Sequence, residues 1–309
     1  MSGCAGRTIR IVRFVVVAHT ARRLDGARHV AEGKRSETND ALAGAAASLG
    51  LPALVLSPRD ALRILEPEDV ALRRLDGREE LDGIETGMPE LEQILAAGGI
   101  LLNPPSSLAA AHDKLLTARI LRRAGVPHPR TWLIGDGAPS PAPELPLVLK
   151  PRFGSWGRDV ARCETADSLA CTLAHFGHRP WFAECGVLAQ ELVPPLGWDL
   201  RLVVAGGEVI GCARRVAAPG EWRTNVALGG RSEPAVPPPL ARRLALEAAA
   251  AVGGDLVGVD LLPLRSGFVV SEVNGAVDFK PRYALRPGDV FRTAVHELLR
   301  VALLRRRAA

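Results

Sequence analysis

The pair of apolar runs at 258–264 and 268–274 constrains the fold of this chain more than any other feature. An Arg-Ser-Gly sequence separates the runs, which predicts an antiparallel hairpin with a three-residue loop and Gly267 at its left-handed position. Counting back from that loop puts Asp260 directly opposite Glu272. We therefore expect antiparallel sheet near the C-terminus.

The predicted hairpin gathers oxygen-bearing side chains on one face. Asn274 shares the face of Glu272 because side chains alternate along a strand. Directly opposed carboxylates repel each other, whereas a divalent cation would make the pairing of Asp260 with Glu272 favourable. Magnesium takes such oxygen ligands alongside substrate phosphates. The alternative is a solvated face with Asn274 in the following turn, and the hairpin alone does not decide between them.

Composition sets broad limits on the rest. The chain has 309 residues, 47% hydrophobic and 24% charged, which is ordinary for a globular enzyme of two or three subdomains. Its net charge of +5 and dispersed arginines allow an acidic substrate or partner without requiring nucleic acid. No apolar run reaches the length of a membrane span. Five scattered cysteines without a Cys-x-x-Cys pair indicate reduced thiols and a cytoplasmic protein.

The N-terminal third has the pattern of a small α/β unit with parallel strands. Residues 9–18 and 54–56 are expected to be strands, and residues 41–49 a helix that ends at a glycine. Residues 19–40 are expected to form a long polar connection, and most of 59–97 has no clear periodicity. The pattern assigns no function to this part.

Two lysines stand at points where an anion could bind. Lys114 follows Asp113, a plausible N-cap, and so lies in the first turn of a helix, where the helix dipole disfavours a cation. A nearby anion would relieve this, although an exposed lysine is the simpler interpretation. Lys150 ends the apolar strand 147–151, and the glycine-bearing loop 152–160 follows it. Such a loop can aim backbone N–H groups at phosphates, or it can be a plain hairpin turn.

A second hairpin, 199–204 with 208–215, carries charges on apolar strands. Alternation puts Asp199 and Arg201 on one face and turns only one of Arg214 and Arg215 inward. Structural ion pairs would explain some of these charges, while several arginines near the carboxylate hairpin suggest an acidic substrate.

Taken in order, these segments resemble the ATP-grasp ligases, and within them the RimK-like branch of the alpha-L-glutamate ligase type. The segments that carry the resemblance are His112-Asp113-Lys114, Leu149-Lys150-Pro151, Gly154-Ser155-Trp156-Gly157-Arg158, Gln190-Glu191, Asp199-Leu200-Arg201, Trp222-Arg223-Thr224-Asn225 through Gly229-Gly230, Asp260, and Glu272-Val273-Asn274. The series runs from near Leu101 to Phe279, and its glycine loop and Glu-Val-Asn run look most like the LysX ligases. The order of the series, rather than any one motif, carries the resemblance.

The resemblance implies an α/β fold of mixed α+β type, namely the ATP-grasp fold with an N-terminal pre-ATP-grasp α/β domain. The implied division is 1–105 for the N-terminal domain, 106–190 for the central lid and 191–309 for the C-terminal subdomain. The N-terminal third resembles the family less, and because that part helps to hold the carboxylate substrate, the identity of the acid stays open.

The resemblance also implies a role for individual residues. ATP would be bound by Lys114, Lys150, Gly154, Ser155, Trp156, Gly157, Arg158, Gln190, Glu191, Val193 and Asp199. Magnesium, as one or two ions for which manganese could substitute, would be held by Asp260, Glu272 and Asn274. Catalytic contacts would come from Arg201, Arg214 and Asn225, and substrate contacts from Arg214, Arg223, Asn225 and Lys280. His112 could act as a general base, although a surface or capping histidine is the simpler expectation.

The implied activity is that of an ADP-forming carboxylate–amine ligase, which activates a carboxylate as an acyl phosphate and joins it to an amino acid such as glutamate. The acceptor could be a small acidic carrier protein or peptide, and we expect a homo-oligomer with neither a nucleic-acid nor a membrane partner. Two rivals remain, a catalytically silent ATP-binding protein and a kinase that stops at a phosphorylated product.

Overall fold

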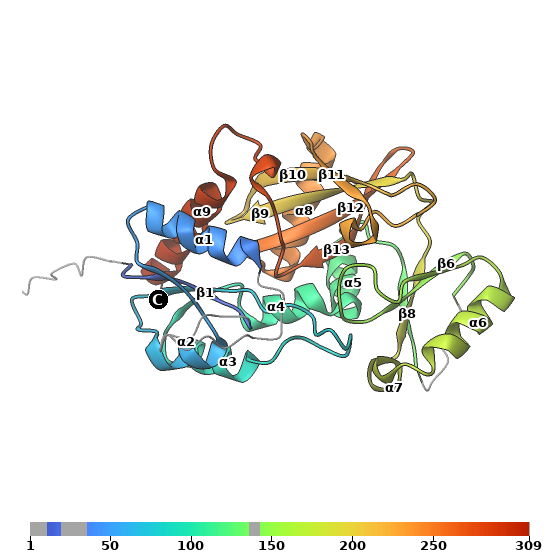
Figure 1. The fold of residues 1–309 in the computed structure, drawn as a ribbon, viewed down its shortest axis with the longest axis horizontal. Coiled ribbons are helices and arrows are strands. Elements are labelled where there is room, and N and C mark those ends of the chain that lie inside the picture. The colour runs from blue at the N-terminus through green and yellow to red at the C-terminus, as the bar shows by residue number, and fades with distance from the viewer. Residues whose placement is uncertain (1–10, 20–35, 136–142, 309) are drawn as a thin grey trace, which may run out of the picture.

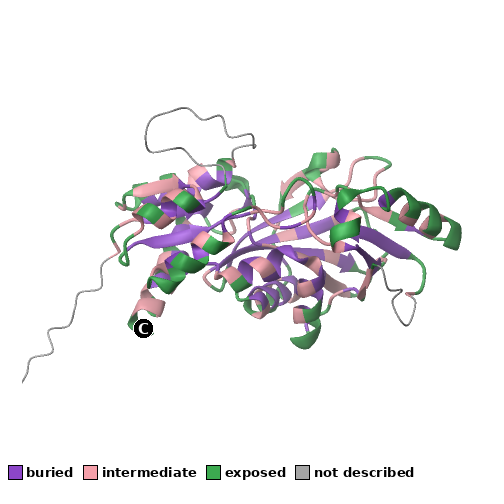
Figure 2. Ribbon diagram, turned by 90° about the horizontal axis from the view of Figure 1, so that it is seen from below, coloured by how far each residue is buried: buried purple, intermediate pink, exposed green. Residues whose placement is uncertain are grey.

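The computed structural model describes residues 11–19, 36–135 and 143–308. Within these ranges the chain builds three sheets in succession, and they lie along the long axis of the molecule (Figure 1). The strands are largely buried, whereas the outward faces of the helices are exposed (Figure 2). None of the described helices is both long and apolar enough to cross a membrane.

The N-terminal sheet is parallel and has the strand order β2-β1-β3-β4. Its strands are β1 (Phe14–Val17), β2 (Ala53–Leu56), β3 (Val70–Arg73) and β4 (Ile100–Leu102), and its helices are α1 (Glu37–Ser48), α2 (Pro58–Ile64) and α3 (Met88–Ala96). Helix α1 covers one face and α2 and α3 the other, so both faces are buried, as parallel sheets require. The predicted parallel α/β unit is thus present, but α1 begins at Glu37, inside the stretch expected to be a connection.

The lid sheet is antiparallel and has the order β5-β8-β6-β7. Its strands are β5 (Thr131–Ile134), β6 (Leu147–Pro151), β7 (Ala161–Cys163) and β8 (Val187–Glu191). Helices α6 (Ala166–Phe176) and α7 (Pro180–Cys185) cover one face, and Phe176 and Trp181 fill the core between them. Leu81 from the N-terminal third joins this core, so a loop from the first sheet is packed into the lid.

The C-terminal sheet is antiparallel and has the order β11-β10-β9-β12-β13. Its strands are β9 (Trp198–Ala205), β10 (Glu208–Val216), β11 (Arg231–Pro234), β12 (Leu256–Leu264) and β13 (Gly267–Asn274), with 3-10 turns η1 (Val226–Leu228) and η2 (Pro281–Tyr283). Helix α8 (Pro239–Val252) packs on one face and α9 (Val290–Ala308) on the other. Helices α4 (Pro105–His112) and α5 (Lys114–Arg123) contact β13 and α8. The prediction grouped them with the lid, and the division into three folding units stays a prediction.

A one-residue bulge sets the register of the β12–β13 hairpin. The turn has two residues, not the three expected, because Leu264 pairs with Gly267. Ser271 then bulges out of β13, since Asp260 pairs with Glu272 and the next pair is Leu261 with Val270. The predicted pairing of Asp260 with Glu272 is therefore confirmed, but only because the bulge compensates for the shorter turn.

A second bulge sets the β9–β10 hairpin. The two-residue turn at Gly206 and Gly207 has positive φ at both positions, which suits a tight hairpin. Pairing changes between Val209 and Gly211, so Ile210 is the extra residue. Without it Arg214 would lie opposite Asp199, and with it Arg215 does.

Candidate active site

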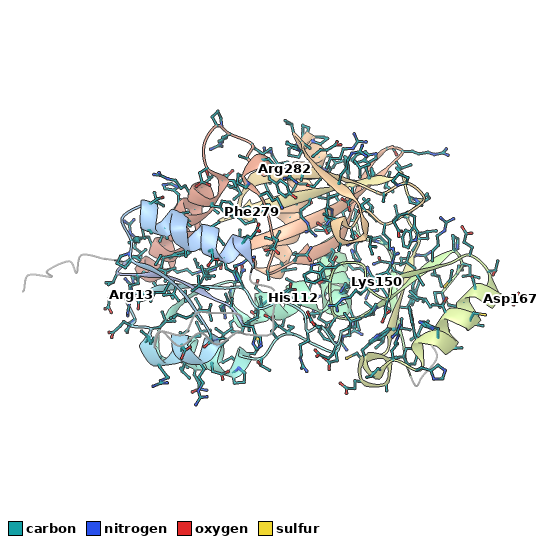
Figure 3. The ribbon with its side chains drawn as sticks, viewed as in Figure 1. Arg13, His112, Lys150, Asp167, Phe279 and Arg282 are labelled. Atoms are coloured by element: carbon teal, nitrogen blue, oxygen red, sulfur yellow. The ribbon has the colours of Figure 1, made fainter. Side chains whose placement is uncertain are left out.

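A cleft of about 1070 Å³, its open mouth included, lies between the lid sheet and the C-terminal sheet. Lys150 marks its position in Figure 3, at the point where the lid joins the rest of the molecule. The predicted site residues that line it are Lys114, Lys150, Gly154, Ser155, Trp156, Gly157, Arg158, Gln190, Glu191, Val193, Asp199, Arg223, Asn225, Asp260 and Glu272. Most of the predicted set, spread over the sequence, thus meets in one place.

The two lysines lie near one carboxylate, that of Glu272. Lys150 ends β6 with its side chain buried, and its Nζ donates to Oε1 of Gln190 at 2.8 Å. Lys114 places Nζ 3.5 Å from Oε1 of Glu272 and donates to the carbonyl of Gly154. Burial lowers the pKa of Lys150 to about 8, although the charge of Glu272 opposes the shift. A bound anion would favour the charged form of Lys150, so this part of the cleft suits an anionic ligand.

The loop after β6 owes its shape to residues with positive φ. Gly154, Trp156, Gly157 and Asp159 have φ of +90°, +67°, +73° and +49°. Positive φ at four of the six residues 154–159 turns backbone N–H groups away from the directions they take in a regular strand, as in the concave loops that bind anions. Trp156 lies at the mouth with 49% of its surface exposed. This geometry supports the phosphate interpretation of the loop over a plain hairpin turn.

A second loop holds the first in place. Arg223 donates to the carbonyls of Gly157 and Val160 at 3.0 and 3.3 Å. Glu221 accepts from the Arg223 guanidinium, and this hydrogen bonding lowers the pKa of Glu221 to about 2. At Gly157 an added Cβ would lie 2.8 Å from Oδ1 of Asn225, so the two loops are in direct contact.

Four charged side chains form a ladder across β10, β9 and β12. Arg215 binds both oxygens of Asp199 at 2.8 and 2.5 Å and reaches Oδ2 of Asp260 at 2.9 Å. Arg201 binds both oxygens of Asp260 at 2.8 Å. Burial would raise the pKa of Asp260, but the two arginines hold it at about 2. Asp260 is therefore ionised, and both carboxylates are paired with arginines, whose N–H groups lie beside the cleft.

The structure corrects the placement of Arg214. Its side chain is exposed, with Cζ 4.6 Å from the centre of the Trp198 ring, whereas Arg215 is buried and lines the cleft. The Ile210 bulge is the physical reason, since it moves every later residue of β10 by one position relative to β9. Lys280 is also exposed and lies outside the lining residues.

The proposed metal ligands are three neighbouring side chains with oxygen atoms that can bind a cation. Asp260 lies opposite Glu272, and Nδ2 of Asn274 is 3.5 Å from Oδ2 of Asp260, so the three side chains are neighbours. Within the described residues no three His, Cys, Asp or Glu side chains group as a metal site. Two carboxylates and an amide oxygen are the ligand types that magnesium takes alongside phosphates. Asp260 could bind the ion only by releasing an oxygen from Arg201 or Arg215, which occupy both of its oxygens.

Two histidines beside the cleft differ from what the sequence indicated. His112 is buried, not on the surface, with Nδ1 3.7 Å from Asp76 and Nε2 without a hydrogen-bond partner in the described part of the chain. No sequence pattern points to His128, yet it contacts Gln190 behind the lid side of the cleft. Its position between two prolines gives no sequence signal for such a role.

Comparison with known proteins places this geometry in context. Residues 111–283 match the RimK-like ATP-grasp domain family. The glutamate–LysW ligase ArgX of Sulfurisphaera tokodaii is 32% identical over 190 residues, which span 60% of this chain and 67% of that protein. The alpha-aminoadipate–LysW ligase LysX of Saccharolobus solfataricus is 32% identical over 185 residues, spanning 58% and 67%. The alignments thus reach about two thirds of each relative's length.

Solved structures agree on the fold. A RimK domain ATP-grasp protein from Sphaerobacter thermophilus superposes with a TM-score of 0.64 at 22% identity, covering 93% of this chain and 100% of that one. The ATP-grasp ligase PsnB, solved with a precursor variant, Mg and ADP, gives 0.59 at 17% identity, with 94% and 99% covered. The predicted ATP-grasp fold is confirmed.

Proposed function

This chain belongs to the RimK-like ATP-grasp family, and from that premise we propose that it is an ATP-dependent, ADP-forming ligase that joins a carboxylate to the amine of an amino acid. The observation that carries the proposal is one cleft in which two lysines, a loop of positive-φ residues and the Asp260–Glu272 pair meet. Each of these three features suits the binding of a nucleoside triphosphate, and ATP-grasp ligases bind ATP.

The chemistry explains why ATP is needed. A carboxylate does not react with an amine at neutral pH because its oxygen is a poor leaving group. Transfer of the γ-phosphoryl group to the carboxylate gives an acyl phosphate and ADP, and attack by the amine then forms the amide and releases phosphate. The protein has only to align the reactants and spread the charge.

We assign the nucleotide to the side of the cleft formed by the lid. Lys150 and the strand after Gln190 would meet the base, with Glu191 and Val193 at its edge. Lys114 and the N–H groups of 154–158 would hold the phosphates. Asp199 lies in the lining, but Arg215 and Thr224 already occupy its oxygens, so a ribose contact would need rearrangement of that pair.

We assign the reacting end to the arginine side. Asp260, Glu272 and Asn274 would hold magnesium, which when bound neutralises phosphate oxygens. Arg215 lines the cleft where it can meet the acyl phosphate, so it takes the role predicted for Arg214. Arg201 lies outside the lining and would act by holding Asp260. Arg223 and Asn225 would contact the substrate from the adjoining loop. Lys280 lies outside the cleft, so it would contact the substrate only if the bound acceptor is large enough to extend beyond the cleft.

The substrate class follows from charge and from the relatives. We propose an acidic amino acid as one substrate and a small acidic carrier protein or peptide as the other, since the named relatives are glutamate– and aminoadipate–LysW ligases. A net charge of +5 favours an acidic partner. The free thiols at Cys163, Cys171, Cys185 and Cys212 suit a reducing cytoplasm. The oligomeric state stays a prediction.

An ADP-release screen across amino acids and carboxylates, with peptides ending in acidic residues as acceptors, tests the proposal. ADP release that depends on both an acid and an amine, with an amide product by mass spectrometry, is expected. A phosphorylated product would favour a kinase. ATP binding without ADP release in any mixture would favour the silent ATP-binding protein, against which the retained Asp260, Glu272 and Asn274 argue.

A further inference from the structure

A linker holds the edge of the C-terminal sheet next to the lid. Strand β13 is the outer strand of its sheet, so its outward backbone groups need partners. At Val270 the linker supplies both, because Val270 N donates to the carbonyl of Pro127 at 2.9 Å and Nδ1 of His128 lies 2.7 Å from the Val270 carbonyl. His128 is therefore fixed to the sheet by its ring as well as by its backbone.

The contact to Val270 determines which ring nitrogen carries the proton. A carbonyl oxygen only accepts, so Nδ1 of His128 must donate and Nε2 is left as an acceptor in the neutral ring. The ring is neutral at pH 7 because burial lowers the pKa of His128 to about 4, with the nearby charge of Lys150 acting in the same direction. His128 thus presents a bare nitrogen toward the lid.

The side-chain amide of Gln190 on β8 donates to this nitrogen. Its amide nitrogen is 3.3 Å from Nε2 of His128 and 2.8 Å from Oγ1 of Thr131. The Thr131 hydroxyl donates to the carbonyl of Pro129 at 2.9 Å and lies 3.4 Å from Nε2 of His128, and its oxygen also accepts from Gln190. Two acceptors beside one amide nitrogen fix the orientation of the Gln190 side chain.

The oriented amide leaves its oxygen on the other side. Oε1 of Gln190 accepts from Nζ of Lys150 at 2.8 Å, and Lys150 is buried at the nucleotide side of the cleft. If Gln190 were turned over, its amino group would face the ammonium, and donor would meet donor. The chain of bonds therefore runs from β13 through the linker and β8 to the lysine on β6.

We infer that His128 is a positioning residue for the nucleotide, which acts through the Gln190 amide to fix the Lys150 ammonium against the bound base and phosphates. The inference rests on the proposed function, because it takes Lys150 to meet a nucleotide. It goes beyond it by joining the C-terminal sheet to the lid through one side chain at the junction of the two.

Two substitutions separate the two ends of the ring. His128→Asn places an amide N–H near the Nδ1 position and can keep the Val270 bond, but it reaches no further toward Gln190. His128→Gln places an amide oxygen near the Nε2 position and can still accept from Gln190. His128→Asn should therefore disturb the position of the Lys150 ammonium, and His128→Gln should preserve it. If His128 served only in packing, the two variants would not differ in this way.

Calorimetric titration of ATP into the full-length protein without acid or amine measures binding directly, and thermal unfolding checks that each variant is folded. We expect His128→Asn to weaken ATP binding about tenfold and His128→Gln to stay within about threefold of the unmodified protein. In the ADP-release assay His128→Asn should raise KM for ATP while kcat changes by less than about twofold, since phosphoryl-transfer groups are untouched.

A second variant keeps the test decisive if His128→Asn folds poorly. Gln190→Leu leaves His128 in place, removes the middle of the chain of bonds from the lid side and should by itself weaken ATP binding about tenfold. Where His128→Asn does fold, adding it to Gln190→Leu should weaken ATP binding no further. Equal ATP affinity of His128→Asn and the unmodified protein, equal losses in the Asn and Gln variants, or additive losses in the double variant would overturn the inference. Absence of ATP binding by the unmodified protein would overturn the proposed function as well.

Discussion

Arg215 shows how much depends on one side chain at the proposed reacting end of the cleft. It bridges Asp199 and Asp260, while the adjacent Arg214 stacks on Trp198 outside the lining. A planar guanidinium can release one oxygen and bind another without leaving the site, which suits a group that must follow developing negative charge.

We expect Arg215→Gln to lower kcat/KM in the ADP-release assay by about 100-fold or more, as loss of a charge-stabilising donor does. The neighbouring Arg214→Gln should stay within about threefold and is the matched control. Arg215→Lys keeps the charge and separates catalysis from the cost of leaving Asp199 and Asp260 short of a partner. Equal losses at 214 and 215 would contradict the assignment.

Lys150 gives the pH dependence a defined sign. Its pKa in the folded protein is about 8, below the value of about 10.4 for a free lysine. Between these values the unfolded chain binds more protons than the folded one, so the contribution of Lys150 to the free energy of unfolding rises with pH across that window. Below it, the buried ammonium is a constant destabilising charge.

Phosphates nearby favour the charged lysine, so ATP binding should raise the pKa of Lys150 and take up protons near pH 8.5. ATP affinity should accordingly fall as pH rises above 8. Titration in two buffers of different ionisation enthalpy measures the uptake, and Lys150→Arg, which stays charged, is the control. Identical binding enthalpies in both buffers for the unmodified protein would rule this out.

At the scale of elements, the strands and helices with regular apolar patterns were predictable and the bulges were not. Strands β6 and β8, the two hairpins and helix α8 follow from local periodicity. Strand β3 was missed because it ends in Arg73, a fully buried charge that breaks an apolar pattern. Ile210 follows another β-branched residue, Val209, and Ser271 is the first of two adjacent polar residues, so neither residue type by itself marks the extra position.

The same contrast holds for the site. Asp260 and Glu272 were found because period-two counting survived two compensating differences, whereas the choice between Arg214 and Arg215 hinged on one uncompensated bulge. His128 could not be found from the sequence, since its role comes from contacts with Val270 and Gln190, distant along the chain.

The loop after β6 carries a prediction with a built-in control. Gly157→Ala adds a Cβ 2.8 Å from Oδ1 of Asn225 at a φ of +73°, while Gly220→Ala adds one with nothing within 4 Å at a similar φ of +79°. In both variants backbone strain should lower the free energy of unfolding by about 1 kcal/mol. Only Gly157→Ala should also raise KM for ATP, by about tenfold. If both variants raise KM alike, strain alone explains the effect.

At the scale of the whole molecule, the N-terminal unit is bound to both other parts. Leu81 lies in the core of the lid, and Asn103 joins the first sheet to the C-terminal one. The Asn103 side chain accepts from the N–H groups of Asp255 and Leu256 at 2.7 and 2.9 Å and donates to Leu256 O at 2.9 Å. Arg305 of α9 binds the same Asp255 carboxylate. The three parts should therefore unfold together.

Asn103→Ala leaves the buried N–H groups of Asp255 and Leu256 and the Leu256 carbonyl without their Asn103 partner. It also places an alanine at a strained φ of +56°. We expect the free energy of unfolding to fall by about 3 kcal/mol and Tm by roughly 5–10 °C, and the single calorimetric transition to split in two. Asn103→Gly relieves the φ but not the lost bonds, so it should recover only part of the loss. A single transition at the unmodified Tm would show that the junction is not needed.

The borders of the C-terminal sheet bear on how the protein behaves when concentrated. One border, β13, has the outward amide and carbonyl of Val270 already engaged by the linker at 127–128. The other, β11, is four residues long, carries Arg231 and Glu233, and ends in proline. Neither border favours the addition of a foreign strand, so self-association by extension of the C-terminal sheet is disfavoured.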